Sequence, residues 1–504
     1  MDTAAEAALL RWRKKKALKP IQTAAGDGLN GVGAAELEEP LSPAARLFHE
    51  PDFNVHIIAE IGSKIPINPH TVKDKLPHSL LKQPRFSSLQ VKDENGNMKW
   101  VPTKVDLERH VIVPDLDPNM DSPDKFVEDY IADLSKVPVD FSKPLWDLHL
   151  LNVRTSQAAA VGVLRIHHSL GDGMSLMSLL LACTRKASDP AALPTIPAAK
   201  KPDFAPAGKG YWWGLRLIWN TVVDVFMFLL TTLFLKDTET PVKGVPTPES
   251  VRWRFIHRTV SLDDIKLVKN ALNATINDVM MGITLAALSR YLNRKYGERK
   301  RARGSAEKKN HLPKNMRLRS TLLVNTRPSA GIHALAEMME KGTEAKWGNH
   351  IGYVLLPFPV AVRDDPLDYV RTAKAIIDRK KHSLEAIGTS YIADFFVKLL
   401  GIKAAAILFH RAPTFTTMGF SNLVGPVEEV CFYGHPLAYL APGCFGQPHA
   451  LMINCQSYIN KMTLILSIDE NTIPDSHDLC DDIEESLKLI KEAVIVKGLA
   501  KRDA

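Results

Sequence analysis

The residues from 158 to 186 predict a buried β-strand that passes through a tight turn into an α-helix. The apolar run AAAVGVLRI at 158–166 indicates the strand, and MSLMSLLLACTRK at 174–186 repeats apolar side chains at helical spacing. A turn that contains two glycines separates them. A chain that joins a strand directly to a helix in this way is expected to build an α/β fold around a sheet.

Two adjacent histidines stand at the end of this predicted strand, and an aspartate stands just before the helix. Successive side chains of a strand point to opposite faces of its sheet. His168 should therefore share the face of Ile166, whereas His167 should share the face of Arg165. We expect the two imidazoles to have different roles.

Three interpretations of His167, His168 and Asp172 are open from the residues alone. In the structural one, a histidine is hydrogen-bonded in the core and Asp172 caps the following helix. In the second, the residues bind a metal, although adjacent histidines point apart and no Cys/His cluster of metal spacing accompanies them. In the third, His168 lies at the mouth of a cleft and removes a proton as a general base.

The length of 504 residues, 45% of them apolar, is too great for one ordinary core and predicts two domains. We expect a mobile basic arm at 1–38 and a first domain at 39–200. A linker at 201–249, which contains an apolar segment, should lead to a second domain at 250–504. Both domains mix strand and helix patterns, so the predicted class is α/β.

Other segments predict individual elements. A strand is expected within FNVHIIAEIG at 53–62, and two strands around a polar turn within ALMINCQSYINKMTLILSID at 450–469. A long helix should begin at the Thr275 to Asp278 start signal and end at Gly297. The segment DDIEESLKLIKEAVI at 481–495 predicts a closing amphipathic helix.

The net charge of +8 is concentrated in one segment. Residues 294–319 contain eleven Lys and Arg against Glu298 and Glu307, a net of +9, so the rest of the chain is close to neutral. Tyr296 is the one Phe, Trp or Tyr in the segment, which is too few for base stacking, and we exclude nucleic acid as a partner. A solvated loop and attraction to anionic lipid head groups both remain open.

The five cysteines are few and odd in number, and they include no CxxC pair. The opening MDTAAEAALLRWRKKK has no apolar signal-peptide core. We therefore expect a reducing, cytosol-facing environment.

The histidine turn resembles the HHxxxDG signature of the chloramphenicol acetyltransferase-like, coenzyme A-dependent acyltransferases. Within that superfamily, five further blocks resemble the plant wax ester synthase/diacylglycerol acyltransferase family. They run in the expected order along the chain: KPLWDLHLL at 143–151, ATINDVMMG at 274–282, GNHIGYVLLPFPV at 348–360, GFSNLVGP at 419–426 and GQPHALMINCQSY at 446–458. The resemblance therefore covers both halves of the sequence.

This resemblance implies two similar mixed-sheet α/β domains with an active-site channel between them. By match to the motif, His168 is the catalytic base and His167 its neighbour. Asp172 is expected in a salt bridge that holds the turn, with Arg165 as a local candidate for the partner. Gly173 is expected to give the channel room beside His168.

The remaining candidate substrate-binding residues lie in the other matching blocks. Asn277, Ser421 and Asn422, or alternatively backbone N–H groups at the glycine turn, are candidate hydrogen-bond donors to the oxyanion of the reaction. Trp146, in the Pro-Leu-Trp element, is a candidate substrate contact.

The chemistry implied by the resemblance suits these residue types. An alcohol hydroxyl has a pKa of about 15.7, like water, and needs a base that removes its proton as the bond forms. A neutral imidazole can accept that proton. A thiolate with a pKa of about 8.5 leaves readily, so the alcohol attacks the thioester directly. We expect acyl-coenzyme A as co-substrate, no other cofactor and no metal.

The segment LIWNTVVDVFMFLLTTLFL at 217–235 has the length of a membrane span. Asp224 near its middle makes insertion marginal, and one crossing would place the two halves of the site in different compartments. We therefore expect the segment to lie in the membrane interface or to cover the lipid entrance, anchored by Trp212, Trp213 and Trp219. A buried inter-domain helix is the alternative.

The sequence thus predicts transfer of a long-chain fatty acyl group from acyl-coenzyme A to a long-chain alcohol, to diacylglycerol, or to both. The expected location is the cytosolic face of the endoplasmic reticulum membrane, with the plasma membrane as a second location. Two alternatives are open: transfer to a soluble alcohol or amine, and a catalytically silent lipid-binding protein of the same fold.

Overall fold

The computed structural model describes residues 39–50, 53–94, 96–197, 211–244, 252–301, 310–326, 331–343, 347 and 351–499. The predicted basic arm at 1–38 lies outside the described residues. The same is true of 198–210 and 245–251 in the linker region and of 302–309 in the basic segment.

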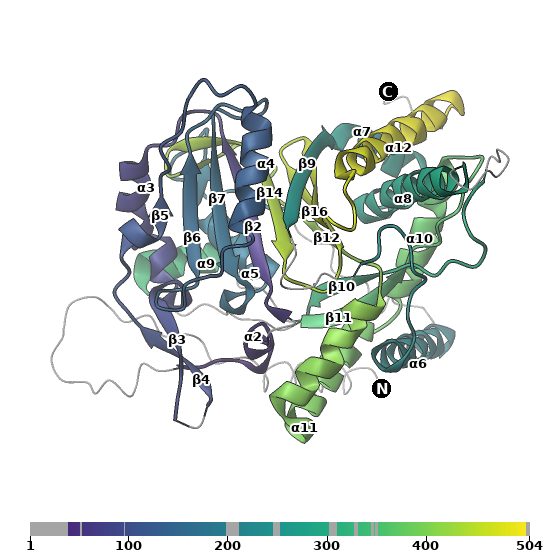
Figure 1. Ribbon diagram of the computed structural model, residues 1–504, viewed down its shortest axis with the longest axis horizontal. Coiled ribbons are helices and arrows are strands. Elements are labelled where there is room, and N and C mark those ends of the chain that lie inside the picture. Colours follow the sequence, from purple (N-terminus) through teal and green to yellow (C-terminus); the bar gives the residue numbers. More distant parts are fainter. Residues whose placement is uncertain are drawn as a thin grey trace.

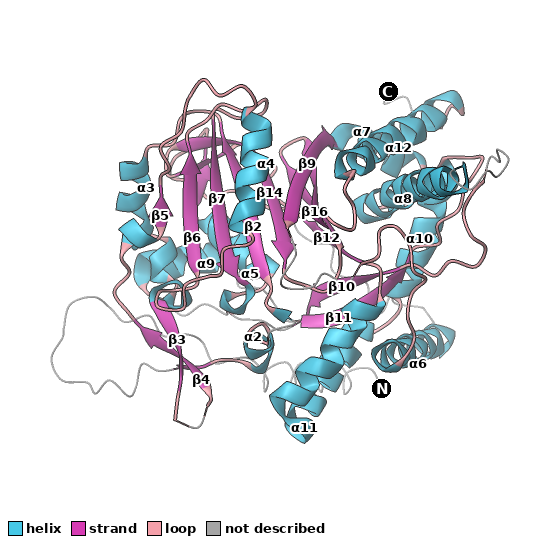
Figure 2. Ribbon diagram, viewed as in Figure 1, coloured by secondary structure: helices cyan, strands magenta, loops and turns pink. Residues whose placement is uncertain are grey.

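Two mixed β-sheets lie side by side, and helices pack against both of them (Figures 1 and 2). The first sheet has the order β5 (Val111–Ile112), β6 (Trp146–Leu151), β7 (Ala160–His167), β2 (His56–Ser63), β14 (His435–Phe445), β13 (Val430–Phe432), β8 (Thr184–Lys186). The second has the order β11 (Ile351–Pro357), β10 (Arg319–Asn325), β12 (Met418–Leu423), β15 (Leu451–Tyr458), β16 (Lys461–Asp469), β9 (Trp253–Ser261). A small third sheet contains β1 (Glu39–Pro40), β4 (Met98–Pro102) and β3 (Ser88–Lys92).

The helices are distributed over both halves of the chain. Those before residue 200 are α2 (Pro43–Leu47), α3 (Pro69–Lys75), α4 (Pro123–Leu134) and α5 (Gly173–Ala182). Those after it are α6 (Tyr211–Leu233), α7 (Leu262–Ala271), α8 (Ile276–Arg301), α9 (Gly331–Lys341), α10 (Leu367–Lys381), α11 (Glu385–Phe415) and α12 (Ser476–Val496).

Strand β14 crosses from the second half of the chain into the first sheet. It pairs antiparallel with β2, and it also contacts β15 and β16 of the second sheet. Most of its residues are buried, as expected of a central strand covered on both faces. The predicted boundary at residue 250 therefore separates two chain segments, but the first sheet takes β13 and β14 from the later one.

The structure contains the elements that the sequence patterns predicted, with several boundaries shifted. The helix expected at 174–186 ends at Ala182, and Thr184–Lys186 form the edge strand β8. β2, β15, β16 and α12 lie where expected. Helix α8 begins with the predicted Thr275 and Asp278 pair, in which each side chain accepts the other residue's backbone N–H. It continues past Gly297 to Arg301, so Gly297 does not end the helix. Gly297 instead allows close packing of His311, whose ring a Cβ at that position would approach to 2.9 Å.

Helix α6 carries the apolar segment and lies on the outside of the second half (Figure 1). By length and composition it could cross a membrane, but only 22% of its most apolar window is buried in the protein. This exposure disfavours the alternative of a buried inter-domain helix. Phe228 packs against Tyr353 and Phe409, so one face of α6 is held on the protein.

Asp224 in the middle of α6 faces the protein and is buried. Its Oδ1 forms ion pairs with Arg379 at 2.7 Å and with Lys380 at 3.0 Å. Lys380 also pairs with the buried Glu385 at 2.6 Å. The aspartate that made membrane insertion costly thus has its partners inside the protein.

We expect Asp224→Ala to lower the free energy of unfolding by about 3 kcal/mol, the lower end of the range for breaking a buried pair. The loss stays at that end because Lys380 keeps Glu385 as a partner. Urea denaturation in detergent would measure it. As a control, Asp368→Ala removes the exposed partner of Arg371 and should cost less than about 1 kcal/mol. Equal losses for the two variants would contradict the assignment.

Candidate active site

The predicted strand, turn and helix form one continuous unit. β7 ends at His167, a short 3₁₀ helix, η7 (His168–Leu170), follows, and α5 begins at Gly173. The backbone N–H of His168 donates to the Val55 carbonyl at 2.9 Å, which ties the turn to the residue just before β2. The position of His168 is therefore determined by backbone bonding and not by its side chain alone.

A tryptophan from the second half of the chain holds the same turn. The indole N–H of Trp347 donates to the Leu170 carbonyl at 2.7 Å. A Cβ at Gly171 would lie 3.0 Å from the Trp347 ring, so the glycine allows the close approach. The sequence patterns did not single out Trp347, which is separated from Leu170 by 177 residues.

His168 lines a cavity and is 8% exposed. Its ring stacks on Phe48, with 4.3 Å between ring centroids. Burial lowers the pKa of His168, and a hydrogen bond to its own backbone and the nearby Asp172 carboxylate offset only part of that effect. The lowered pKa favours the neutral imidazole, which is the form that can accept a proton.

His167 is fully buried and both of its ring nitrogens have partners. Nδ1 lies 2.6 Å from the Ser169 hydroxyl, and Nε2 lies 3.0 Å from the Asn54 side-chain oxygen. Burial and the neighbouring His56 and His49 lower the pKa of His167 well below its ordinary value. As expected from the strand geometry, the two histidines are in different surroundings, and His167 is part of the packed interior.

Asp172 caps α5, because its Oδ1 accepts the backbone N–H of Ser175 at 2.9 Å. Arg165 does not pair with it, so the proposed partner of Asp172 was wrong. Arg165 instead donates to both oxygens of Asp147, at 3.1 and 2.6 Å, because Asp147 is its direct neighbour on β6. Burial alone would raise the pKa of Asp147, but hydrogen bonds from His149 and Arg165 hold it well below its ordinary value.

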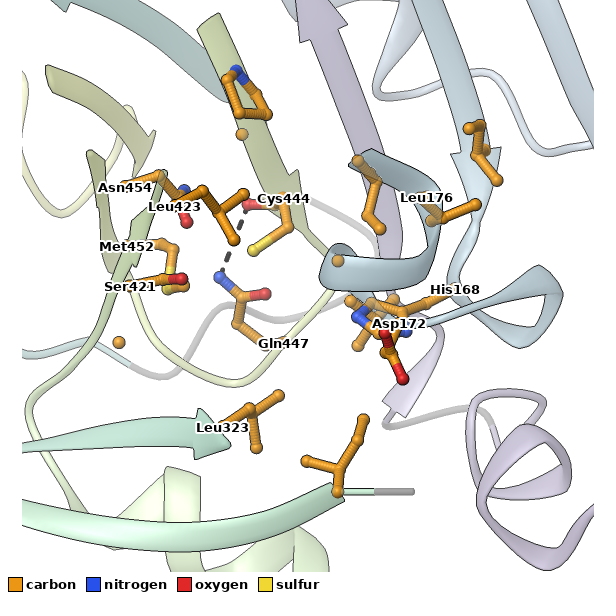
Figure 3. Close-up of a pocket in the computed structure, with 18 of the residues that line it drawn as sticks. His168, Asp172, Leu176, Leu323, Ser421, Leu423, Cys444, Gln447, Met452 and Asn454 are labelled. Carbon is orange, nitrogen blue, oxygen red and sulfur yellow. Dashed lines mark hydrogen bonds between the residues drawn. The ribbon is translucent and has the colours of Figure 1, made fainter. Parts of the chain in front are cut away.

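A cavity of about 190 Å³ lies between the two large sheets and is lined mainly by apolar side chains. β2, β7 and α5 contribute from the first half, and β10, β11, β12 and β15 from the second. Figure 3 shows His168 and Asp172 on one side of it and Ser421, Met452 and Asn454 on the other. An apolar cavity with a few polar groups is typical of a ligand site.

The structure brings some of the predicted site residues to this cavity and not others. Ser421 and Gly173 line it, and the space in front of Gly173 is open. Asn277 and Asn422 are not among its lining residues, and they bond to each other at 2.5 Å. Trp146 is a core residue whose indole N–H donates to the Phe86 carbonyl, so it does not face the cavity.

Comparison with solved structures identifies the class of fold. The wax ester synthase/diacylglycerol acyltransferase from Marinobacter aquaeolei VT8 matches with a TM-score of 0.58 and 17% identity, over 90% of this chain and 100% of that one. The first condensation domain of the CDA synthetase matches with a TM-score of 0.53 and 12% identity, over 89% and 92% of the two chains. The predicted mixed-sheet α/β fold is confirmed, and it is shared with these two proteins.

Sequence comparison then identifies the family. The wax ester synthase/diacylglycerol acyltransferase catalytic domain matches residues 70–280, and the WS/DGAT C-terminal domain matches residues 347–491. Wax ester synthase/diacylglycerol acyltransferase 11 of Arabidopsis thaliana is 51% identical over 92% of this chain and 96% of its own length. Number 4 of that species is 53% identical over 91% of both. The chain belongs to the wax ester synthase/diacylglycerol acyltransferase family, as its motifs predicted.

We expect Asp172→Ala to lower the free energy of unfolding by about 1 kcal/mol, because it removes the acceptor at the start of α5. Asp172→Asn keeps an oxygen acceptor at that position and should lose less stability than Asp172→Ala. Urea denaturation of the three proteins would compare them. If Asp172→Ala were as stable as the wild type but inactive, Asp172 would have a direct chemical role and not a capping role.

Proposed function

We propose that this protein transfers a long-chain fatty acyl group from acyl-coenzyme A to a long-chain alcohol, to diacylglycerol, or to both, with His168 as the general base. Membership of the family makes it an O-acyltransferase. The observation that carries the assignment of the base is the position of the His168 imidazole in the wall of the apolar cavity, where burial lowers its pKa.

The reaction follows from the chemistry of the groups that meet in the cavity. The acceptor hydroxyl oxygen attacks the thioester carbonyl carbon while His168 accepts the hydroxyl proton. The carbon–sulfur bond then breaks, and the coenzyme A thiolate leaves and takes up the proton that His168 held. The product is an oxygen ester. No acyl group is attached to the protein, so both substrates have to be bound together.

The lining of the cavity favours a lipid acceptor over a soluble one. The walls around His168 are built from apolar side chains such as Leu164, Leu176 and Met177. Transfer of an alkyl chain from water to such surroundings is favourable, whereas transfer of a small polar alcohol is much less so.

We expect His168→Ala to lower kcat by about 10²- to 10⁴-fold, the usual contribution of a general base, with the protein still folded. His449→Ala is a matched control, since His449 is another buried imidazole that lines the cavity and lies 2.9 Å from the Thr416 hydroxyl. It should cost much less. Purified protein with labelled palmitoyl-coenzyme A and either hexadecanol or dioleoylglycerol would provide the assay.

The assignment of the base fails if His167→Ala or His449→Ala lowers kcat more than His168→Ala in folded proteins. A wild-type protein that turns over a short soluble alcohol faster than both lipids would support the soluble-acceptor alternative. The absence of turnover with every acceptor would support a silent lipid-binding protein.

We propose further that α6 and α11 bind the cytosolic face of a membrane, that of the endoplasmic reticulum first and the plasma membrane second. The two helices contact each other, and both present exposed apolar side chains. On α6 these are Trp212, Leu215, Ile218, Trp219, Val222, Phe226 and Leu233, and on α11 they are Tyr391, Phe395, Leu399, Leu400 and Ile407. We call these twelve residues the apolar helix pair. They are more numerous than the single, scattered apolar residues that are normal on a protein surface.

The bend of α11 adds to the support for an interfacial position. Gly401 has φ 78° and ψ 168°, a conformation that glycine adopts and other residues avoid, so α11 consists of two helical parts joined there. Leu399 and Leu400 are exposed at this bend. Pro413, near the end of the same helix, lines the cavity. The apolar helix pair is therefore connected to the cavity through α11, as a lipid acceptor would require.

We expect the protein to need detergent for release from microsomes, and salt alone to leave it bound. We expect a protein with four combined substitutions, Trp219→Gln, Phe226→Gln, Phe395→Gln and Leu399→Gln, to have a liposome partition coefficient at least about tenfold lower. Full burial of one such side chain contributes about 1.5 kcal/mol or more. Gln substitutions at the exposed residues Val137, Phe141, Ile495 and Val496 are the control.

Tags at both ends should be equally open to protease outside sealed microsomes. Protection of one tag alone would show that the chain crosses the membrane once, and the interfacial assignment would then be wrong.

A further inference from the structure

The second wall of the cavity contains a buried amide that the mechanism does not use. Asn454 lies on β15 and is 7% exposed. Its neighbours Ile453 and Cys455 point to the opposite face, into the core of the second half. Met452 and Asn454 point into the cavity (Figure 3).

The side-chain nitrogen of Asn454 is buried and has no oxygen or nitrogen acceptor among the described residues. Ser421, its direct partner on the parallel strand β12, faces the cavity beside it. The amide interacts with the Cys444 thiol, but burial raises the pKa of that thiol to about 12, so it stays protonated and is only a weak acceptor. A buried donor without an acceptor is unfavourable in the free protein, and a ligand that supplies an acceptor relieves that penalty.

The two lipid acceptors differ in what they can offer this donor. A long-chain alcohol has one oxygen, which has to lie at His168 for the reaction, and the rest of it is hydrocarbon. Diacylglycerol has the same reacting hydroxyl and, a few bonds away, two ester groups whose carbonyl oxygens accept hydrogen bonds. An ester carbonyl that enters an apolar cavity without a donor loses its bonds to water and gains none.

We propose that Asn454 is a specificity-determining residue that donates a hydrogen bond to an ester carbonyl of diacylglycerol and thereby favours diacylglycerol over a long-chain alcohol. The inference rests on the proposed function, because it names the acceptor class of the same site. With a long-chain alcohol bound, the amide stays without a partner and the penalty persists. A site whose buried polar group hydrogen-bonds one substrate discriminates strongly against a substrate that lacks the matching group.

An amide carbonyl of the pantetheine arm of coenzyme A has the same acceptor chemistry as an ester carbonyl. The two sources differ in which kinetic constant depends on Asn454. A bond to diacylglycerol affects kcat/KM for that acceptor alone. A bond to pantetheine affects KM for acyl-coenzyme A with every acceptor.

The test is Asn454→Leu, which keeps the approximate volume and removes the donor. We expect the ratio of kcat/KM for dioleoylglycerol to kcat/KM for hexadecanol to fall by about tenfold or more. The KM for palmitoyl-coenzyme A with hexadecanol should not change. Asn454→Gln, which keeps an amide on a longer arm, should retain part of the preference. The thermal midpoint of Asn454→Leu should equal or exceed that of the wild type, because an orphaned donor is removed.

Ser467→Ala is the matched control. The Ser467 hydroxyl, on the neighbouring strand β16, is also buried without a partner among the described residues, but it does not line the cavity. Its substitution should leave the acceptor ratio unchanged.

An unchanged ratio in Asn454→Leu, or an equal loss with both acceptors, would overturn the inference. So would a raised KM for palmitoyl-coenzyme A with both acceptors, or a clear drop in thermal midpoint, which would show that the amide is already satisfied in the protein. If the wild type acylates neither lipid, the proposed function fails, and this inference fails with it.

Discussion

The pairing of β14 with β2 is the interaction on which the rest of the molecule depends. β14 comes from late in the chain, yet it is a central strand of the first sheet and also contacts β15 and β16 of the second. The sheets approach closely there: a Cβ at Gly443 would lie 2.8 Å from the Ser467 hydroxyl. Because β2 also pairs with β7, the same connection sets the distance between His168 and the opposite wall of the cavity.

Buried charges in both halves are matched by partners, and these pairs keep helices and strands in place around the cavity. Arg165 and Asp147 join β7 to β6 next to the histidine turn. Asp224 joins α6 to Arg379 at the end of α10. Unpaired, any of these groups would be costly to bury, so each pair restricts which surfaces can meet. Asn454 differs from them because its amide nitrogen lacks such a partner among the described residues.

Much of the site could be predicted because its first half is local in sequence. Four features depend on residues that are close together in sequence: the strand, the turn, the position of His168 on it and the cap formed by Asp172. Side-chain periodicity and capping preferences apply over such short distances along the chain. The partner of Arg165 could not be predicted in this way. Arg165 was near Asp172 in sequence, but strand register placed it opposite Asp147. Trp146, taken from a motif, is used for packing and not for contact with the cavity.

The sequence by itself determined the family, the α/β class, the histidine turn and the amphipathic helices, because each is encoded in short patterns of apolar and polar residues. Only the tertiary structure decided which groups face one another across the cavity. The entry of β14 into the first sheet, the contact of Trp347 with the turn and the inward face of Asp224 all join residues more than 100 positions apart. Such contacts depend on the packing of whole sheets and helices, and no local pattern records them.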